Sequence, residues 1–347
     1  MISGTLAADA IKSGHALPFV SSGLAFTQCE IIRRVQGETL CREFLTARDM
    51  ASGSRRDELS ELIVRVTTER PPLRLSAATL LFDRPLVMGI VNVTPDSFSG
   101  DGLAGDVTAA IARGRQHVEE GADVLDIGGE STRPGADFVD PDEECDRILP
   151  VISALKDLGV PISVDTRRAK VMTVATAAGA TIINDVSALT GDPHSLDVAA
   201  AAGAAVVLNH MRGSPRDMQD NPHYADVVLD VYDELAARIE AAVAAGISRE
   251  HLIVDPGLGF GKTAAHNFQL LSSLALYQGL GCPLLIGASR KSFLGAISGG
   301  GTPAERLPGS LSAAIAAVQQ GANIVRVHDV APTRQALKTL SAIDGGN

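Results

Sequence analysis

The sequence contains no tryptophan, and aromatic residues make up only 3% of its 347 positions. The hydrophobic core must therefore be built mainly from Ala, Val, Ile and Leu. Basic charge is also scarce, since 30 Lys and Arg stand against 41 Asp and Glu, giving a net charge of −11. This balance argues against a nucleic-acid partner, which requires a basic surface to neutralise phosphates. A small anionic substrate remains compatible, because it needs only a local cluster of cations.

Cysteines are few and show no metal-binding or disulfide-framework pattern. Cys29, Cys41, Cys145 and Cys282 form no CxxC pair, and none lies at metal-ligand spacing from a histidine. We interpret them as buried or incidental thiols, which suits a reducing compartment. No apolar run approaches the ~20 residues that cross a bilayer, and no signal-peptide pattern opens the chain. We therefore expect a cytoplasmic protein with no membrane partner.

The first 83 residues differ from the rest of the chain and carry no chemical motif. The stretch Ile-Val-Arg-Val at 63–66 predicts a short strand, and the Pro-Pro pair at 71–72 marks a break. The chain is long enough for one large domain with an appendage. We interpret residues 1–83 as an N-terminal extension without an assigned role, and residues 84–347 as the unit that carries the site.

From Leu86 onward, short runs rich in Val and Ile alternate with longer Ala-rich segments of helical period. The runs lie at 87–93, 124–127, 161–164, 181–184, 205–208, 252–254, 283–287 and 323–327. Continuous apolar runs suit strands of a parallel sheet that is buried on both faces, and the segments between them are long enough for crossover helices. Eight such units predict an α/β fold, a (β/α)₈ TIM barrel, with a doubly wound open sheet as the alternative.

Each apolar run ends in polar residues, where barrel enzymes carry their chemistry. In chain order these are Asn92, Asp126, Asp165, Asn184 with Asp185, Asn209 with His210, Asp255, Ser289 with Arg290 and Lys291, and Arg326 with His328 and Asp329. A single polar strand end is ordinary, and Asp185 and Asp329 are equally explained as helix caps. Eight in succession favour a ring of binding residues over turn chemistry alone.

The residue types in this ring indicate what it binds. Acceptors and an amide at Asp126, Asn184 and Asp255 suit a flat heterocycle with amino and ring N–H donors. Cations suit a phosphorylated group, and they lie at Arg133, Lys291, Arg326 and His328. The side-chain oxygen of Asn92 suits a hard cation beside phosphate oxygens. The sequence therefore predicts a nitrogen heterocycle at one end of the site and a phosphorylated group at the other.

One segment resembles part of a phosphate-binding P-loop but lacks a residue that this motif requires. The segment Gly-Phe-Gly-Lys-Thr at 259–263 looks like the end of a phosphate-binding P-loop. The full pattern requires glycine at position 256, where this chain has Pro256. We therefore assign no P-loop function to this segment.

Seven segments, in order, make the chain resemble the dihydropteroate synthases, a family of pterin-binding TIM barrels. They are MGIVNVTPDSF at 88–98, DIGGESTRPG at 126–135, SVDT at 163–166, IND at 183–185, DPGLGFGK at 255–262, SRK at 289–291 and RVHD at 326–329. The resemblance runs from about Met88 to Val330. The first two segments together with Ser-Arg-Lys are highly specific.

The resemblance implies a transferase of folate biosynthesis that joins 6-hydroxymethyl-7,8-dihydropterin diphosphate to 4-aminobenzoate, releasing 7,8-dihydropteroate and diphosphate. It implies that pterin is held by Asp126, Asp165, Asn184, Asp255 and Lys291. It implies that diphosphate is held by Asn92 through Mg²⁺ and by Arg133, Arg326 and His328. It implies that 4-aminobenzoate is held by Phe98, Thr132, Pro134, Phe260, Ser289 and Lys291. Catalytic roles fall on Asp96, Asp101, Arg133, Asp165 and Lys291, and the assembly is expected to be a homodimer.

The physical chemistry agrees with this activity. Diphosphate departs readily once Mg²⁺, arginine and histidine neutralise its charge. The carbon left behind becomes cationic and is stabilised by the electron-rich pterin and by carboxylates such as Asp96 and Asp165, after which the arylamine attacks. We hypothesise that the loops at 96–101 and 132–134 order only with diphosphate bound and then exclude water, which would compete for the cation.

Three features depart from the family pattern. The first loop reads Ser-Gly-Asp-Gly at 99–102 where the family usually reads Ser-Asp-Gly-Gly, which shifts Asp101 by one position. Asn209 stands where many members have Met, and the segment before Met88 is longer than the enzyme needs.

Two other functions are alternatives to this assignment. A methyltetrahydrofolate–corrinoid methyltransferase would need the pterin residues but neither the Thr-Arg-Pro loop nor the Ser-Arg-Lys set, and both sets are present. A catalytically silent paralogue is supported only by Asn209 and the shifted Asp101.

Overall fold

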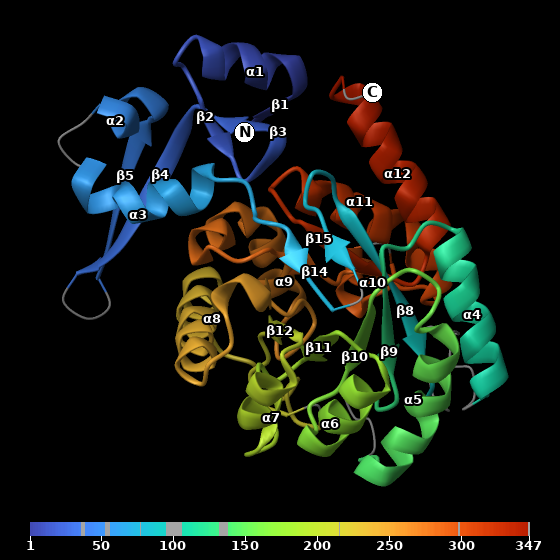
Figure 1. Ribbon diagram of the computed structural model, residues 1–347. Coiled ribbons are helices and arrows are strands. Elements are labelled where there is room, and N and C mark those ends of the chain that lie inside the picture. Colours follow the sequence, from blue (N-terminus) through green and yellow to red (C-terminus); the bar gives the residue numbers. More distant parts are fainter. Residues whose placement is uncertain are drawn as a thin grey trace.

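Eight parallel strands follow one another around the central part of the molecule, each joined to the next by a helical crossover (Figure 1). The computed structural model describes residues 1–35, 39–52, 56–76, 78–94, 106–131, 138–214, 216–297 and 299–345. The strands are β8 (Leu86–Asn92), β9 (Val124–Gly128), β10 (Ile162–Asp165), β11 (Ile182–Asp185), β12 (Ala205–Asn209), β13 (Leu252–Asp255), β14 (Leu285–Ile286) and β15 (Ile324–Val327). Every predicted apolar run therefore contains a strand.

The sheet closes into a barrel. Its first strand, β8, pairs with β9 on one side and with the last strand, β15, on the other. The remaining seam lies between β13 and β14, where Val254 and Leu284 form a parallel bridge and Val254 N donates to Pro283 O at 2.9 Å. The predicted (β/α)₈ barrel is thus confirmed, and the open-sheet alternative is excluded because its edge strands would remain unpaired.

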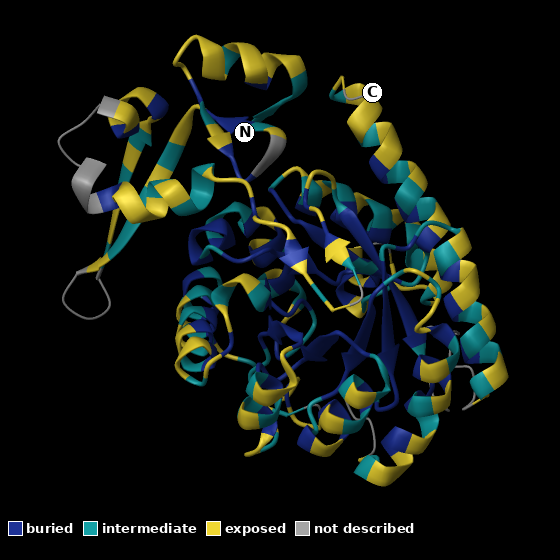
Figure 2. Ribbon diagram, in the orientation of Figure 1, coloured by how far each residue is buried: buried dark blue, intermediate teal, exposed yellow. Residues whose placement is uncertain are grey.

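Helices cover the outside of the barrel. They are α4 (Val107–Glu119), α5 (Pro141–Leu155), α6 (Ala169–Ala178), α7 (Ser195–Ala202), α8 (Val227–Ala244), α9 (Ala264–Ser272), α10 (Ser292–Ile297), α11 (Leu307–Val318) and α12 (Val330–Ile343). Asp106, Asp140 and Asp226 cap α4, α5 and α8 by accepting backbone N–H groups of the first turn. Figure 2 shows buried strands within and helices whose outer faces are exposed, as amphipathic periodicity requires.

The N-terminal extension forms a lobe beside the barrel (Figure 1). It contains β1 (Ile2–Ser3), α1 (Gly4–Lys12), β2 (Leu17–Phe19), β3 (Ser21–Phe26), β4 (Gln28–Val35), β5 (Thr39–Thr46), α2 (Ala47–Ser52) and α3 (Arg56–Thr67). A small core of Phe19, Val20, Phe26, Ala47 and Met50 holds the lobe together. Its antiparallel hairpin β4–β5 lies near α8, where Arg34 donates to Asp230 at 3.3 Å and to Asp233 at 3.0 Å.

The strand predicted at 63–66 is wrong, because these residues form the last part of helix α3. Leu59, Ile63 and Val66 recur at helical spacing. Ile63 and Val66 pack against the core of the lobe, and Leu59 is buried. Two adjacent β-branched residues suggested a strand, but the period of the wider segment decides its conformation.

Three arginines donate to carbonyls at the end of one short helix, η2 (Leu274–Leu280), and two of them, Arg65 and Arg70, connect the extension with the barrel. Arg70 donates to Gln278 O at 2.8 Å, Arg65 to Gly279 O at 3.3 Å and Arg249 to Leu280 O at 3.0 Å. Carbonyls at a helix end lack intrahelical partners. Here the extension supplies two of the three side chains that satisfy them.

A short hairpin closes the amino-terminal end of the barrel. It consists of β6 (Leu73–Arg74) and β7 (Thr79–Leu80). Leu73, Leu80 and Phe82 are buried in one cluster with the first residues of the barrel strands, such as Leu86 and Ile324. This hairpin lies within the predicted extension, yet its apolar side chains complete the barrel core.

No helix within the described part of the chain is long and apolar enough to cross a membrane. All four cysteines are free thiols.

Candidate active site

The carboxyl ends of the strands bring the predicted polar residues together. Strand register places Asn92 and Asp165 each opposite Gly128, and Asp165 opposite Asn184. Asn209 lies opposite Asp255. These side chains come from consecutive strands that pair directly in the sheet, so parallel pairing makes them neighbours. The predicted ring is therefore present at the expected end of the barrel.

Asp126 lies deeper than the sequence suggested. Strand β9 continues to Gly128, and Asp126 pairs in register with Ile90 and Ser163. Its side chain is completely buried. Asn184 Nδ2 donates to Asp126 Oδ2 at 3.1 Å. Asp126 and Asn184 thus form the inner floor of the site.

Arg326 of β15 joins two carboxylates of this floor. Its Nε donates to Asp126 Oδ2 at 2.5 Å, and its Nη2 donates to Asp165 Oδ2 at 2.6 Å. Burial disfavours the charge of Arg326, but the two carboxylates outweigh burial and raise its pKa. Burial raises the pKa of Asp165, and Arg326 opposes that rise. The predicted diphosphate ligand Arg326 therefore reaches the pterin floor through two of its nitrogens.

Unpartnered acceptors remain on the floor. Asp126 Oδ1 and Asp165 Oδ1 are buried and have no hydrogen-bond partner among the described residues, and the same is true of Ser163 Oγ. An unsatisfied buried acceptor costs on the order of 1–3 kcal/mol unless a ligand or water supplies a donor. These oxygens are therefore suited to a ligand with several N–H groups.

Lys291 lies between the floor and the loop after β13. Its Nζ lies 4.2 Å from the centre of the Phe260 ring, in cation–π geometry, and donates to Leu258 O. Burial lowers the pKa of Lys291 to about 8, and Asp255 opposes this shift. Asp255 Oδ1 accepts from Gly257 N at 2.7 Å. The predicted pair Lys291 and Phe260 is thus a direct contact.

Ser289 and His328 meet at the outer rim. Ser289 Oγ lies 3.0 Å from His328 Nδ1 and accepts from His328 N at 3.1 Å. These residues come from the loop after β14 and from the end of β15. The contact places a hydroxyl and an imidazole side by side, next to the strand that carries Arg326.

Among the described residues, the site offers one suitable side-chain ligand for Mg²⁺, Asn92, and no complete set of protein ligands. Asn92 is half-buried at the end of β8 and presents a neutral amide oxygen. The described residues contain no group of three or more His, Cys, Asp or Glu that could hold a metal. Mg²⁺ usually keeps several waters and binds through few protein ligands plus substrate phosphates. Asn92 fits that type of site.

Six predicted site residues lie outside the described part of the chain. They are Asp96, Phe98, Asp101, Thr132, Arg133 and Pro134. The hypothesis about their two loops therefore remains a prediction, as do the roles assigned to these side chains.

Two buried ionisable side chains were not predicted from the sequence as part of the site or its surroundings. Lys262 is buried at 3% exposure and lies 2.9 Å from His210 Nδ1. Glu144 is fully buried, and neither of its carboxylate oxygens has a hydrogen-bond partner among the described residues. The lysine of the rejected Gly-Phe-Gly-Lys segment was visible in the sequence, but its partner lies 52 residues away. Glu144 sits in an acidic helix start and carries no local sign of burial.

Asp185 has a structural role, although it does not cap a helix as the alternative for this residue supposed, because α7 begins only at Ser195. Its Oδ1 accepts from Ser187 N at 2.7 Å, and its Oδ2 accepts from Leu189 N at 3.0 Å. It therefore shapes the turn after β11.

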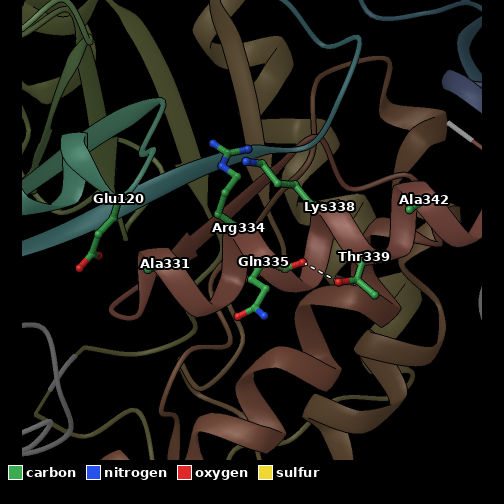
Figure 3. A pocket seen from close by; sticks show the side chains of 7 residues that line it. All are labelled: Glu120, Ala331, Arg334, Gln335, Lys338, Thr339 and Ala342. Carbon is green, nitrogen blue, oxygen red and sulfur yellow. Dashed lines mark hydrogen bonds between the residues drawn. The ribbon is translucent and has the colours of Figure 1, made fainter. Parts of the chain in front are cut away.

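A shallow surface depression lies along α12, away from the strand ends (Figure 3). Its lining includes Arg334 and Lys338. Arg334 is already engaged, donating to Gly121 O and to Asp123. One of the two cations that line the depression is therefore already bound to other residues of the chain.

Comparison with known proteins agrees with this location. The family described as pterin binding enzyme matches residues 88–328. A dihydropteroate synthase of Neisseria meningitidis serogroup B is 49% identical over 266 residues, which cover 75% of this chain and 93% of that protein. The dihydropteroate synthase of Escherichia coli K12 is 44% identical over 265 residues, covering 76% and 93%.

Solved structures give the same result. The dihydropteroate synthase of Yersinia pestis, solved with a sulfonamide drug complex, superposes with a TM-score of 0.77 at 44% identity, covering 80% of this chain and all of that one. The enzyme of Xanthomonas albilineans with 4-aminobenzoic acid gives a TM-score of 0.74 at 49% identity, with coverage of 80% and 100%.

Proposed function

The chain belongs to the pterin-binding enzymes, in their dihydropteroate synthase family, and on this basis we propose that it joins 6-hydroxymethyl-7,8-dihydropterin diphosphate to 4-aminobenzoate. The products are 7,8-dihydropteroate and diphosphate. The chain covers 93% of its relatives from Neisseria and Escherichia, so the match extends over nearly their whole length.

One observation carries the proposal: the inner floor combines buried, unpartnered carboxylate oxygens with fixed cations. Asp126 Oδ1 and Asp165 Oδ1 have no hydrogen-bond donor among the described residues, and Arg326 and Lys291 supply positive charge nearby. A pterin presents amino and ring N–H groups along one edge, and these can satisfy the orphaned acceptors. A diphosphate at its other end would meet the rim at Asn92 and His328.

The reaction breaks the carbon–oxygen bond between the pterin methylene and diphosphate. The departing oxygen gains negative charge, which Arg326 Nη1 and the His328 imidazole would stabilise. Arg326 Nε and Nη2 are bound to carboxylates, which leaves Nη1 for this role. The methylene carbon gains positive charge, which the Asp165 carboxylate stabilises. The fixed position of these groups supplies stabilisation without reorganisation during the step.

The arylamine then forms the new carbon–nitrogen bond and loses one proton. Lys291 and Phe260 form the wall on which the aromatic acid lies, with the ammonium facing its carboxylate and the ring stacking on its ring. Ser289, which contacts His328, offers a further hydrogen bond at this wall. Because an arylamine is a weak base, its lone pair is free at neutral pH and the proton leaves after attack. We also assign aminobenzoate contacts to Phe98, Thr132 and Pro134, and catalytic roles to Asp96, Asp101 and Arg133.

Mg²⁺ bound at Asn92 would neutralise diphosphate charge and so improve the leaving group. We further propose a homodimer and a cytoplasmic location. The location suits four free thiols. Light scattering of the purified chain tests the dimer.

Diphosphate release tests the proposed reaction. Purified protein mixed with the pterin diphosphate, 4-aminobenzoate and Mg²⁺ is expected to release one diphosphate for each dihydropteroate formed. Asp126→Asn replaces the floor acceptor with an amide and is expected to reduce kcat/KM by about a hundred-fold or more. Lys291→Ala and Arg133→Ala are expected to abolish release, while Lys338→Ala on the exposed face of α12 serves as control. No release by the wild-type chain would show a catalytically silent relative and refute the proposal.

A further inference from the structure

Lys262 places a buried amine between the loops that follow β12 and β13. Its Nζ lies 2.9 Å from His210 Nδ1, 3.0 Å from Phe260 O and 3.4 Å from His210 O. The side chain is 3% exposed. Three acceptors surround one nitrogen, which is the hydrogen-bonding capacity of an ammonium group.

The neighbouring groups fix where the protons lie. His210 Nε2 lies 2.9 Å from Glu234 Oε2, and Glu234 also accepts from Arg212. Hydrogen bonding to His210 lowers the pKa of Glu234 to about 2, so this carboxylate is ionised at neutral pH. Burial lowers the pKa of His210 to about 4, so the ring is neutral and directs its single N–H toward Glu234. Nδ1 is then an acceptor, and Lys262 must donate to it.

Lys262 and Lys291 both donate hydrogen bonds to backbone carbonyls of the loop at 256–262. Lys262 donates to Phe260 O, and Lys291 donates to Leu258 O. The loop also packs closely on the segment after β12, since a Cβ on Gly257 would lie 1.8 Å from His210 O and one on Gly261 2.4 Å from Arg212 O. The Phe260 ring lies under Lys291 as a result of this placement.

Lys262 also faces Asp255 electrostatically. Burial raises the pKa of Asp255, while Lys291, Arg326 and Lys262 oppose that rise. Burial lowers the pKa of Lys262, which Asp255 and Glu234 oppose and which Lys291 and Arg212 reinforce. Burial thus disfavours the ammonium form of Lys262, but the three acceptors around its Nζ favour it. In that form Lys262 adds a positive charge that favours the ionised carboxylate of Asp255.

We propose that Lys262 is a positioning residue for pterin transfer, which fixes the 256–262 loop through its hydrogen bond to Phe260 O and adds a positive charge to the environment of Asp255. The inference rests on the proposed function, since it assigns a role within that site. It gives the Gly-Phe-Gly-Lys segment a function other than phosphate binding.

Two substitutions separate charge from hydrogen bonding. Lys262→Met removes both, while Lys262→Gln keeps N–H donors and removes only the charge. The measurements are kcat and KM for each substrate and kcat/KM for the pterin diphosphate across pH 5 to 9, together with the melting temperature. Lys338→Met is the matched control on the exposed face of α12.

Loss of the Lys262 charge raises the pKa of Asp255, so the acidic limb of kcat/KM should move to higher pH in both variants. Lys262→Met should also raise KM for the pterin diphosphate by roughly ten-fold, and Lys262→Gln by less. A purely structural role would change the melting temperature and leave the pH profile in place. Profiles that superpose on the wild type in a folded variant would overturn the inference.

The two proposals fail in different ways. A wild-type chain without turnover refutes the proposed function. An active wild type with unshifted variants refutes only the role of Lys262. If Lys262→Met does not fold, Lys262→Gln still gives the decisive pH profile. If neither variant folds at 20 °C, the role is in stability and the proposed effect on Asp255 is overturned.

Discussion

Arg290 and Asp329 form a bidentate ion pair between the loop after β14 and the start of α12. Arg290 Nε lies 2.9 Å from Asp329 Oδ2, and Nη2 lies 2.6 Å from Oδ1. The backbone of Arg290 has φ of +58°, which is uncommon for any residue except glycine. Ser310 Oγ accepts from Arg290 N at 2.8 Å, and Arg306 donates to Arg290 O at 3.0 Å. This turn sets the directions of Ser289 and Lys291 on either side.

Asp329→Asn keeps the shape of the side chain and removes its charge. We expect kcat/KM to fall about ten-fold, because the left-handed turn loses its strongest restraint and Lys291 is less well placed. Asp146→Asn, at an exposed position on α5, is the control and should leave kcat/KM unchanged. Steady-state kinetics beside thermal melting separates this effect from a loss of folded protein. Full activity in Asp329→Asn would mean that Ser310 and Arg306 hold the turn unaided.

Because the proposed reaction uses the charged form of Lys291, we expect kcat/KM to fall at alkaline pH. Burial lowers its pKa to about 8, so the ammonium that faces Phe260 and the substrates is lost as the pH rises through about 8. Separately from the acidic limb that reports Asp255, we expect kcat/KM to fall as the pH rises above about 8. Lys291→Arg, whose guanidinium stays charged, should remove this limb while lowering the plateau. A wild-type profile that stays flat to pH 9.5 would contradict the assignment.

Glu144 predicts that stability depends on pH. Its burial raises the pKa to about 7 from an ordinary value of 4.5. The folded state therefore binds this proton more tightly than the unfolded state, and stability falls as the pH rises from about 4.5 to about 7. The full effect is roughly 3 kcal/mol.

Glu144→Gln removes this ionisation. Between pH 5 and pH 8, urea unfolding should show the variant gaining roughly 2–3 kcal/mol relative to the wild type. Glu119→Gln, an exposed position on α4, should show no such change. Parallel stability curves for Glu144→Gln and wild type would mean that the buried carboxyl does not titrate in this range.

Arg70 links the N-terminal extension to the barrel, so we expect its substitution to lower the free energy of unfolding. It is 7% exposed and donates to Arg65 O, to Gln278 O and to Gln278 Oε1. Arg70→Met leaves these acceptors without their donor and should lower the free energy of unfolding by about 2–3 kcal/mol. Arg74→Met, at an exposed position of β6, should cost less than about 0.5 kcal/mol. Equal effects of the two substitutions would refute a tie through Arg70.

The sequence alone determined the barrel and most of the floor. Strand runs, helical periods and the polar residue at each strand end are local features, so Asn92, Asp165, Asn184 and Asp255 could be placed at one end of the barrel before any contact was known. The order of the strands follows from the repeating unit, since parallel strands require crossovers and eight of them close.

Only the tertiary structure decided which of these residues touch. Arg326 reaches Asp126 across 200 positions and Asp165 across 161, and Lys262 reaches His210 across 52. Such separations leave no local pattern, so the sequence could not predict that Arg326, the expected diphosphate ligand, also binds two carboxylates of the floor. The junction of Arg65 and Arg70 with the end of η2 was decided in the same way, by packing between segments that the sequence keeps apart.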